Sequence, residues 1–155
     1  MKALMGRLFG KKVNKIFMNE DYLKFETDKG NVVFSVDSDC CSQSVFYDFY
    51  GVKKLLNNGS IVSAKAIELQ PSDIVRGDGY DTDKKSYQES ISVYGFEIVT
   101  IDPKLNLEVT SVFSFRNYSN GYYGGNLENS GNRKVSPEIF DDVVETISNP
   151  IKHPK

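Results

Sequence analysis

Residues 89–118, ESISVYGFEIVTIDPKLNLEVTSVFSFRNY, contain two long runs in which apolar residues recur with a period of two. The first run, residues 89–102, is apolar on both faces, with Ile91, Val93, Val99 and Ile101 on one face and Tyr94, Phe96 and Ile98 on the other. The second run, residues 106–118, has the same character, and the DPK tripeptide at residues 102–104 predicts a turn between them. Because both faces are apolar, we expect the two runs to pair as a central antiparallel hairpin.

Further strand patterns surround this hairpin. They are short alternations bounded by polar or glycine-containing turns, and they cover residues 11–18, 21–27, 31–37, 60–69 and 121–128. The first three follow one another closely, which predicts an antiparallel meander. Residues 3–9 predict one or two helical turns, and residues 52–59 predict a short helix that ends at an Asn-Asn-Gly sequence. Residues 45–49 fit either a strand or a helix.

The C-terminal part of the chain has the pattern of a helix. Ser136 and Pro137 suit the N-cap and the first helical position, and apolar residues recur at helical spacing through residues 136–148, followed by a tail at residues 149–155. We therefore expect one α+β domain over residues 1–155 with its core in about residues 10–128. Its antiparallel sheet would have about six or seven strands, flanked by short helices that include the C-terminal one.

The composition restricts the class of partner. The formal net charge is −2, so the chain lacks the overall basic field that duplex nucleic-acid binders usually carry. No apolar run reaches the roughly 20 residues needed to cross a bilayer. The apolar part of residues 1–12 is also too short for a signal peptide. We expect a cytoplasmic protein that binds neither membranes nor duplex nucleic acid.

Residues 37–42, DSDCCS, contain both cysteines of the chain, Cys40 and Cys41. A disulfide between neighbouring residues is strained, so we expect two thiols. The only histidine, His153, lies near the chain end, so a Cys–His catalytic pair is not expected, and two adjacent cysteines make a poor metal chelate. One interpretation is a structural turn in which one cysteine packs in the core while Asp39 and Ser42 hold the turn, and the other is a ligand-binding loop.

Residues 115–128, FRNYSNGYYGGNLE, are the second candidate site. Arg116 can form paired hydrogen bonds with a phosphate or carboxylate, and the rings of Tyr122 and Tyr123 can stack on a flat ligand. Asn120 can both donate and accept hydrogen bonds, as a base or a ribose requires. The structural alternative is a glycine-rich hairpin end whose tyrosines cover the sheet.

These segments resemble a small family of phage-encoded domains of unknown function. The resemblance rests on DSDCCS at residues 37–42, YGFEIVT at residues 94–100 and SNGYY at residues 119–123, and it covers roughly residues 10–128. The chain differs from that pattern by a longer acidic loop at residues 70–88, whose spacing does not fit an EF-hand, and by its terminal helices. The resemblance implies shared positions in both motifs and assigns no catalytic residue.

Together these observations predict a phage-encoded, non-enzymatic anti-defence protein of the infected cell's cytoplasm. It would bind and sequester a small nucleotide-derived immune signal, without a cofactor, a metal or catalytic residues. The expected ligand-binding residues are Asp39, Ser42, Arg116, Ser119, Asn120, Tyr122 and Tyr123. The alternative is a protein–protein inhibitor of a host defence enzyme that uses exposed tyrosines as anchors, and homo-oligomer formation is compatible with both. An enzyme that acts through Cys40 or Cys41 is the least favoured interpretation.

Overall fold

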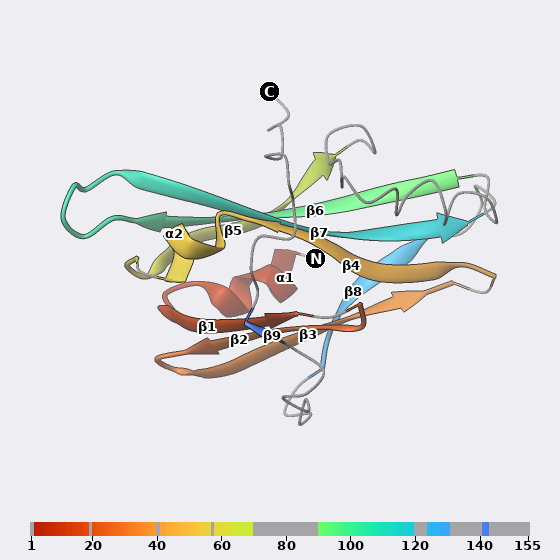
Figure 1. The fold of residues 1–155 in the computed structure, drawn as a ribbon, viewed down its shortest axis with the longest axis horizontal. Helices are drawn as coiled ribbons and strands as arrows, with labels where there is room; N and C mark the ends of the chain where they lie inside the picture. The colour runs from red at the N-terminus through yellow and green to blue at the C-terminus, as the bar shows by residue number, and fades with distance from the viewer. Residues whose placement is uncertain are drawn as a thin grey trace.

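The protein is a sandwich of two antiparallel β-sheets (Figure 1). The computed structural model describes residues 2–18, 20–39, 41–56, 58–69, 90–119, 124–130 and 141–142. Its strands are β1 (Val13–Met18), β2 (Tyr22–Thr27), β3 (Gly30–Ser38), β4 (Gln43–Tyr50), β5 (Ile61–Leu69), β6 (Ser90–Ile101), β7 (Glu108–Ser119), β8 (Gly125–Asn129) and β9 (Asp141–Asp142). The helical elements are short: α1 (Lys2–Met5), the 3₁₀ turn η1 (Gly6–Leu8) and α2 (Val52–Leu56).

The strands divide into a five-stranded sheet, in the order β8-β3-β2-β1-β9, and a four-stranded sheet, in the order β4-β7-β6-β5. The N-terminal meander and the central hairpin are confirmed, and β6 pairs with β7 without interruption from Ser90↔Ser119 to Ile101↔Glu108. The segment that fitted either a strand or a helix is strand β4. Sequence alternation therefore identifies most of the strands.

The core lies between the two sheets and is dominated by phenylalanine. The ring centroid of Phe113, on β7, lies 4.9–6.4 Å from the ring centroids of five other phenylalanines, which are Phe25, Phe34, Phe46, Phe49 and Phe96. Met5 and Leu8, from the N-terminal turns, are fully buried in the same cluster, and Leu4 packs against it partly buried. Buried aromatic pairs add about 0.5–1.5 kcal/mol each beyond the burial of their surface, so this cluster fixes how the sheets face each other.

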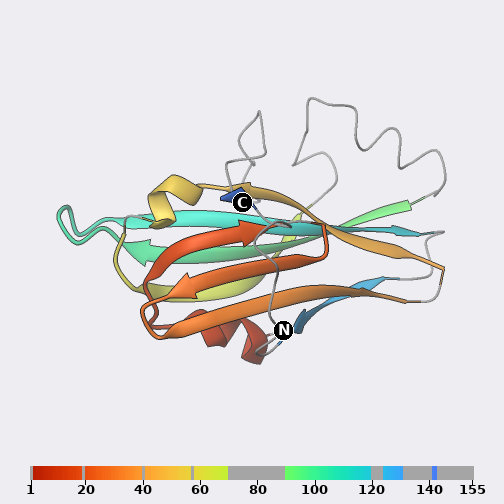
Figure 2. The same ribbon diagram turned by 60° about the horizontal axis from the view of Figure 1, so that its bottom comes forward.

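The chain passes between the sheets twice at one end of the sandwich (Figure 2). Strands β3 and β8 pair in the five-stranded sheet, whereas β4 and β7 pair in the four-stranded sheet. The β3–β4 connection and the β7–β8 connection therefore leave one sheet and enter the other at the same end. This topology brings Asp39 close to Gly124, the residue before β8.

The predicted α+β class was wrong, because the described chain is two stacked sheets with only short helices rather than one sheet with flanking helices. The predicted C-terminal helix over residues 136–148 was also wrong, because Asp141 and Asp142 form strand β9. They pair with Met18 and Phe17 of β1. Backbone pairing with a distant strand thus overrides the helical spacing of local apolar residues. The remainder of that prediction, and the acidic loop at residues 70–88, lie outside the described residues.

In the described part of the chain, no helix has the length and apolar character needed to cross a membrane.

Candidate functional site at the sheet crossing

In the β3–β4 connection, Asp39 and Ser42 are joined by hydrogen bonds. The backbone N–H of Ser42 donates to the carbonyl oxygen of Asp39 at 3.1 Å, and the Ser42 hydroxyl donates to the same oxygen at 2.8 Å. Cys41 has a φ of +68° and is exposed. This left-handed conformation is uncommon for residues other than glycine, asparagine and aspartate. The hydrogen bonds expected between Asp39 and Ser42 are present, but Cys41 is exposed and so is not the cysteine expected to pack in the core.

The turn is bonded to Gly124, the residue that immediately precedes β8. The backbone N–H of Asp39 donates to the Gly124 carbonyl at 3.0 Å, and the Gly124 N–H donates to Oδ2 of the Asp39 carboxylate at 3.0 Å. The Ser42 hydroxyl lies 3.4 Å from the same carbonyl oxygen. The two segments singled out in the sequence therefore meet at Gly124.

Beneath this turn lies a buried polar network centred on Asn117 of β7. Its Nδ2 donates to the hydroxyls of Ser42 at 3.1 Å and Ser44 at 2.9 Å, and Ser44 donates to the carbonyl of Asp37 at 2.9 Å. Asn117 is 0% exposed, and no group among the described residues donates a hydrogen bond to its Oδ1. Asp39, Ser42, Ser44, Asn117 and Gly124 are called the crossing cluster below.

Gly125 makes the close approach of the two sheets possible. A Cβ atom at this position would overlap the Ser44 hydroxyl and would lie 2.9 Å from the Asp37 carbonyl oxygen and 3.2 Å from Nδ2 of Asn117. A residue without a side chain is therefore required where β8 passes the network. This requirement accounts for the second glycine of the Gly-Gly pair.

The predicted ligand-binding residues fall into three groups. Asp39 is exposed, Ser42 is half-buried, and Ser119 is buried two positions after Asn117, on the same face of β7. Arg116 is not brought together with them. The remaining three, Asn120, Tyr122 and Tyr123, lie outside the described residues, as does Cys40.

Arg116 projects from the opposite face of β7. Phe115, the preceding residue, packs against Phe46 in the core, and successive strand residues point to opposite faces. In the cross-strand register Arg116 lies between Val45 of β4 and Val93 of β6. It is 0% exposed and takes part in interactions within the chain. Its guanidinium therefore lies away from the crossing cluster and is covered.

Three residues at the crossing were missed in the sequence, namely Ser44, Asn117 and Gly125. Asn117 gave a usable signal, since period two places it on the face of Phe113 and Phe115, where an amide needs partners. Ser44 gave no such signal, because its role depends on pairing between strands that are distant in the sequence. In the sequence Gly125 belongs to a glycine-rich hairpin end, and its close contact with Ser44 depends on the packing of β8 against β4.

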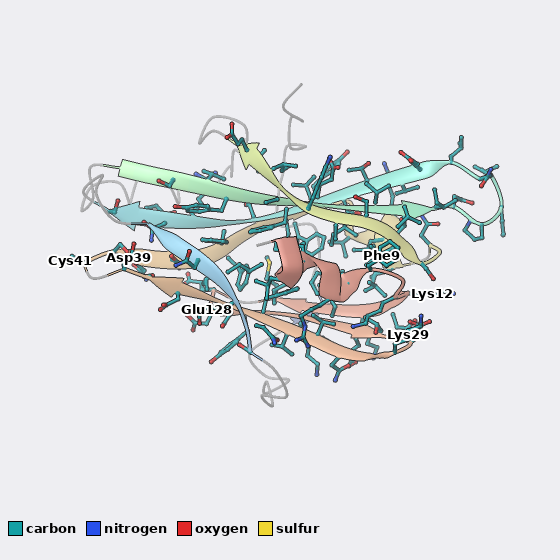
Figure 3. All side chains as sticks on the ribbon, turned by 180° about the vertical axis from the view of Figure 1, so that it is seen from behind. Phe9, Lys12, Lys29, Asp39, Cys41 and Glu128 are labelled. Atoms are coloured by element: carbon teal, nitrogen blue, oxygen red, sulfur yellow. The ribbon has the colours of Figure 1, made fainter. Side chains whose placement is uncertain are left out.

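The exposed surface around the crossing is acidic. Asp37, Asp39 and Glu128 are all exposed, and Figure 3 shows Asp39 beside Cys41 at this end of the molecule and Glu128 further along β8. Among the described residues, no three histidine, cysteine or acidic side chains lie close enough together to hold a metal ion. The groups available to a ligand here are mainly hydrogen-bond acceptors: carboxylates, serine hydroxyls and an amide oxygen.

Asp102 lies at the far end of the sandwich, in the turn between β6 and β7, and its carboxyl group has a shifted pKa. Hydrogen bonds from the backbone N–H groups of Leu105 and Lys104 hold the pKa of the Asp102 carboxyl below its ordinary value. This carboxylate organises a protruding turn in which Leu105 is exposed. It has no part in the crossing cluster.

Comparison with known proteins finds that this chain is similar in sequence to a viral protein. The "Uncharacterized protein L278" of Acanthamoeba polyphaga mimivirus is 34% identical over 128 residues, which cover 75% of this chain and 84% of the mimivirus protein. No solved structure matches the chain significantly. Residues 6–128, which include both crossing segments and the central hairpin, match the family described as a domain of unknown function, DUF7448. The chain therefore belongs to the DUF7448 family.

Proposed function

We propose that this protein is a phage-encoded, non-catalytic anti-defence protein that sequesters a small nucleotide-derived immune signal at the crossing cluster. The observation that carries the proposal is the buried Oδ1 of Asn117, to which no described group donates. A buried acceptor without a donor costs about 1–3 kcal/mol. An N–H or O–H group of a ligand would remove that penalty, so the position favours a donor-bearing molecule.

The neighbouring groups suit the sugar and base of a nucleotide. One oxygen of Asp39 accepts the Gly124 N–H, which leaves the other oxygen as an acceptor for ribose hydroxyls, the role that acidic residues have in dinucleotide sites. Ser42 and Ser119 add hydroxyls that can donate as well as accept. Asn120, Tyr122 and Tyr123 immediately precede Gly124 in the sequence, and we propose that they contact the base and ribose.

That Arg116 contacts a phosphate of the ligand stays a prediction, and it requires the ligand to reach the Arg116 side chain. Because the side chain is buried on the outer face of β7, the ligand would have to reach that face and displace present contacts. Arg116→Ala tests this part separately from the crossing cluster.

The proposal is tested by small molecules that co-purify with the full chain from cells with an active nucleotide-signalling defence. The released molecules would be identified by mass spectrometry after denaturation. We expect one nucleotide-derived species in stoichiometric amount with the native protein, and a large loss with Asp39→Asn. Asp37→Asn is the matched control, because both carboxylates are exposed but only that of Asp39 bonds to Gly124. Equal retention by both variants, or no nucleotide with the native protein, would contradict the proposal.

A second candidate, a protein inhibitor of a host defence enzyme, is favoured by the exposed acids Asp37, Asp39 and Glu128. Exposed acidic groups suit a basic partner surface, such as the nucleic-acid-binding face of an enzyme. This function predicts that Asp37→Asn and Asp39→Asn weaken partner binding to similar extents and that binding falls with added salt. The same pair of variants thus separates the two functions.

A further inference from the structure

A pocket of about 330 Å³ lies at the β5–β6 pair, and one of its lining residues, Tyr94, reaches Gly124 of the crossing cluster. Its lining is mostly apolar and comes from two short segments: Ala66, Ile67, Glu68 and Leu69 of β5, and Val93, Tyr94, Gly95 and Phe96 of β6. This volume is at the lower end of the range for small-molecule sites, about 300–1,000 Å³. It is large enough for a single heteroaromatic ring system.

Two lining side chains give the pocket its chemistry. Glu68 is the charged residue among the described lining groups, and it is exposed. It is the direct cross-strand partner of Tyr94, so both side chains project from the same face of the sheet. The Tyr94 ring is held by stacking on Phe115, with centroids 4.7 Å apart and planes 15° apart. A fixed aromatic ring therefore stands beside a carboxylate that accepts hydrogen bonds.

Tyr94 connects this pocket to the crossing cluster. A Cβ atom placed on Gly124 would lie 2.8 Å from the Tyr94 hydroxyl oxygen, so that hydroxyl is next to the residue that joins the two crossing segments. Phe115, on which Tyr94 stacks, precedes Asn117 by two positions on the same face of β7. A ligand that contacts the crossing cluster can thus extend along Tyr94 into the pocket.

We propose that the pocket is a base-binding subsite selective for guanine. This inference rests on the proposed function and specifies the base of the ligand. The apolar lining and the Tyr94 ring suit a flat ring system, and a carboxylate only accepts hydrogen bonds. Guanine presents two adjacent donors, N1–H and the 2-amino group, which can form paired bonds with the two oxygens of Glu68. Adenine, cytosine and uracil each present an acceptor next to a donor on the corresponding edge, which a carboxylate repels.

The test uses the full chain with two probes that differ by one group, GMP and IMP. IMP lacks the 2-amino group and so can form only one of the paired bonds. We expect GMP to bind at least about tenfold more tightly than IMP, as the loss of one charge-assisted hydrogen bond implies. Binding would be followed by calorimetry and by ¹⁵N chemical shifts, with the largest changes at the amides of Tyr94 and Gly95.

Glu68→Gln should remove the difference between the two probes, because an amide no longer offers two acceptor oxygens. Lys65→Gln is the matched control on the same strand, since Lys65 lies outside the pocket and pairs with Glu97 at the surface. One outcome would overturn the pocket assignment and leave the proposed function standing. In that outcome, Asp39→Asn abolishes nucleotide binding but Glu68→Gln does not change it. The absence of binding by any nucleotide would overturn both.

Discussion

Replacing Gly125 by alanine should destabilise the protein strongly, although it adds only one methyl group. That methyl would overlap the Ser44 hydroxyl and approach the Asp37 carbonyl oxygen to 2.9 Å. Overpacking of this kind costs about 1–3 kcal/mol. If Ser44 rotates away, its bonds to Asp37 and Asn117 are lost at about 1 kcal/mol each. The expected total of about 3–5 kcal/mol corresponds to a fall of about 6–20 °C in Tm for a domain of this size.

Thermal and urea denaturation, followed by circular dichroism, would measure this loss. Gly6→Ala is the control, because nothing lies within 4 Å of a Cβ at Gly6, and it should leave stability nearly unchanged. Ser44→Ala supplies the sharper comparison, since it removes the hydroxyl with which the methyl collides. In that background Gly125→Ala should cost at least about 1 kcal/mol less than in the native chain. If the losses of stability caused by Gly125→Ala and Ser44→Ala were fully additive, or if Gly125→Ala alone left Tm unchanged, the close packing of β8 on the crossing cluster would be refuted.

Three further outcomes are expected. Alkylation of the denatured protein without reductant should add two labels, at Cys40 and Cys41, and a disulfide between them would contradict the thiol assignment. Phe113→Ala should lower the free energy of unfolding, measured by urea denaturation, by about 3–5 kcal/mol because it empties the centre of the core. Leu105→Ala, at an exposed position, should change it by no more than about 0.5 kcal/mol. Similar losses for the two variants would contradict the assigned core. Because the pKa of Asp102 is lowered in the folded state, its contribution to the β6–β7 turn should be complete above about pH 4 and lost as the pH falls through the lowered pKa. Amide shifts of the turn that do not change between pH 5 and pH 2 would contradict this.

The strands were predictable from sequence because alternation is a local property. The meander and the central hairpin follow from period two and from turn residues such as Gly30, which has a φ of +103°. Local patterns do not reveal how strands divide between sheets. That division depends on pairings such as Asp37↔Asn126, which join residues far apart in the chain. The helix predicted for residues 136–148 failed for the same reason, since β9 is defined by its pairing with β1.

The candidate site was predictable in part. Asp39 of the first candidate segment, residues 37–42, is hydrogen-bonded to Gly124 of the second, residues 115–128. The face of Arg116 was also available from the sequence, since it alternates with Phe115, but the covering of that face was not. Alternation along β7 was sufficient to place Asn117 on the core face, but only the three-dimensional contacts show that no described group donates a hydrogen bond to its Oδ1.

The central claim is that the crossing cluster binds a small nucleotide-derived ligand through Asp39 and Asn117. Its most direct test is calorimetric titration of the native chain, Asp39→Asn and Asp37→Asn with the nucleotide that co-purifies from defence-active cells. We predict saturable binding at one site per chain by the native protein and by Asp37→Asn, and affinity at least about tenfold weaker for Asp39→Asn, as expected for a charged hydrogen bond. Equal affinities for all three proteins, or no saturable binding by the native chain, would contradict the claim.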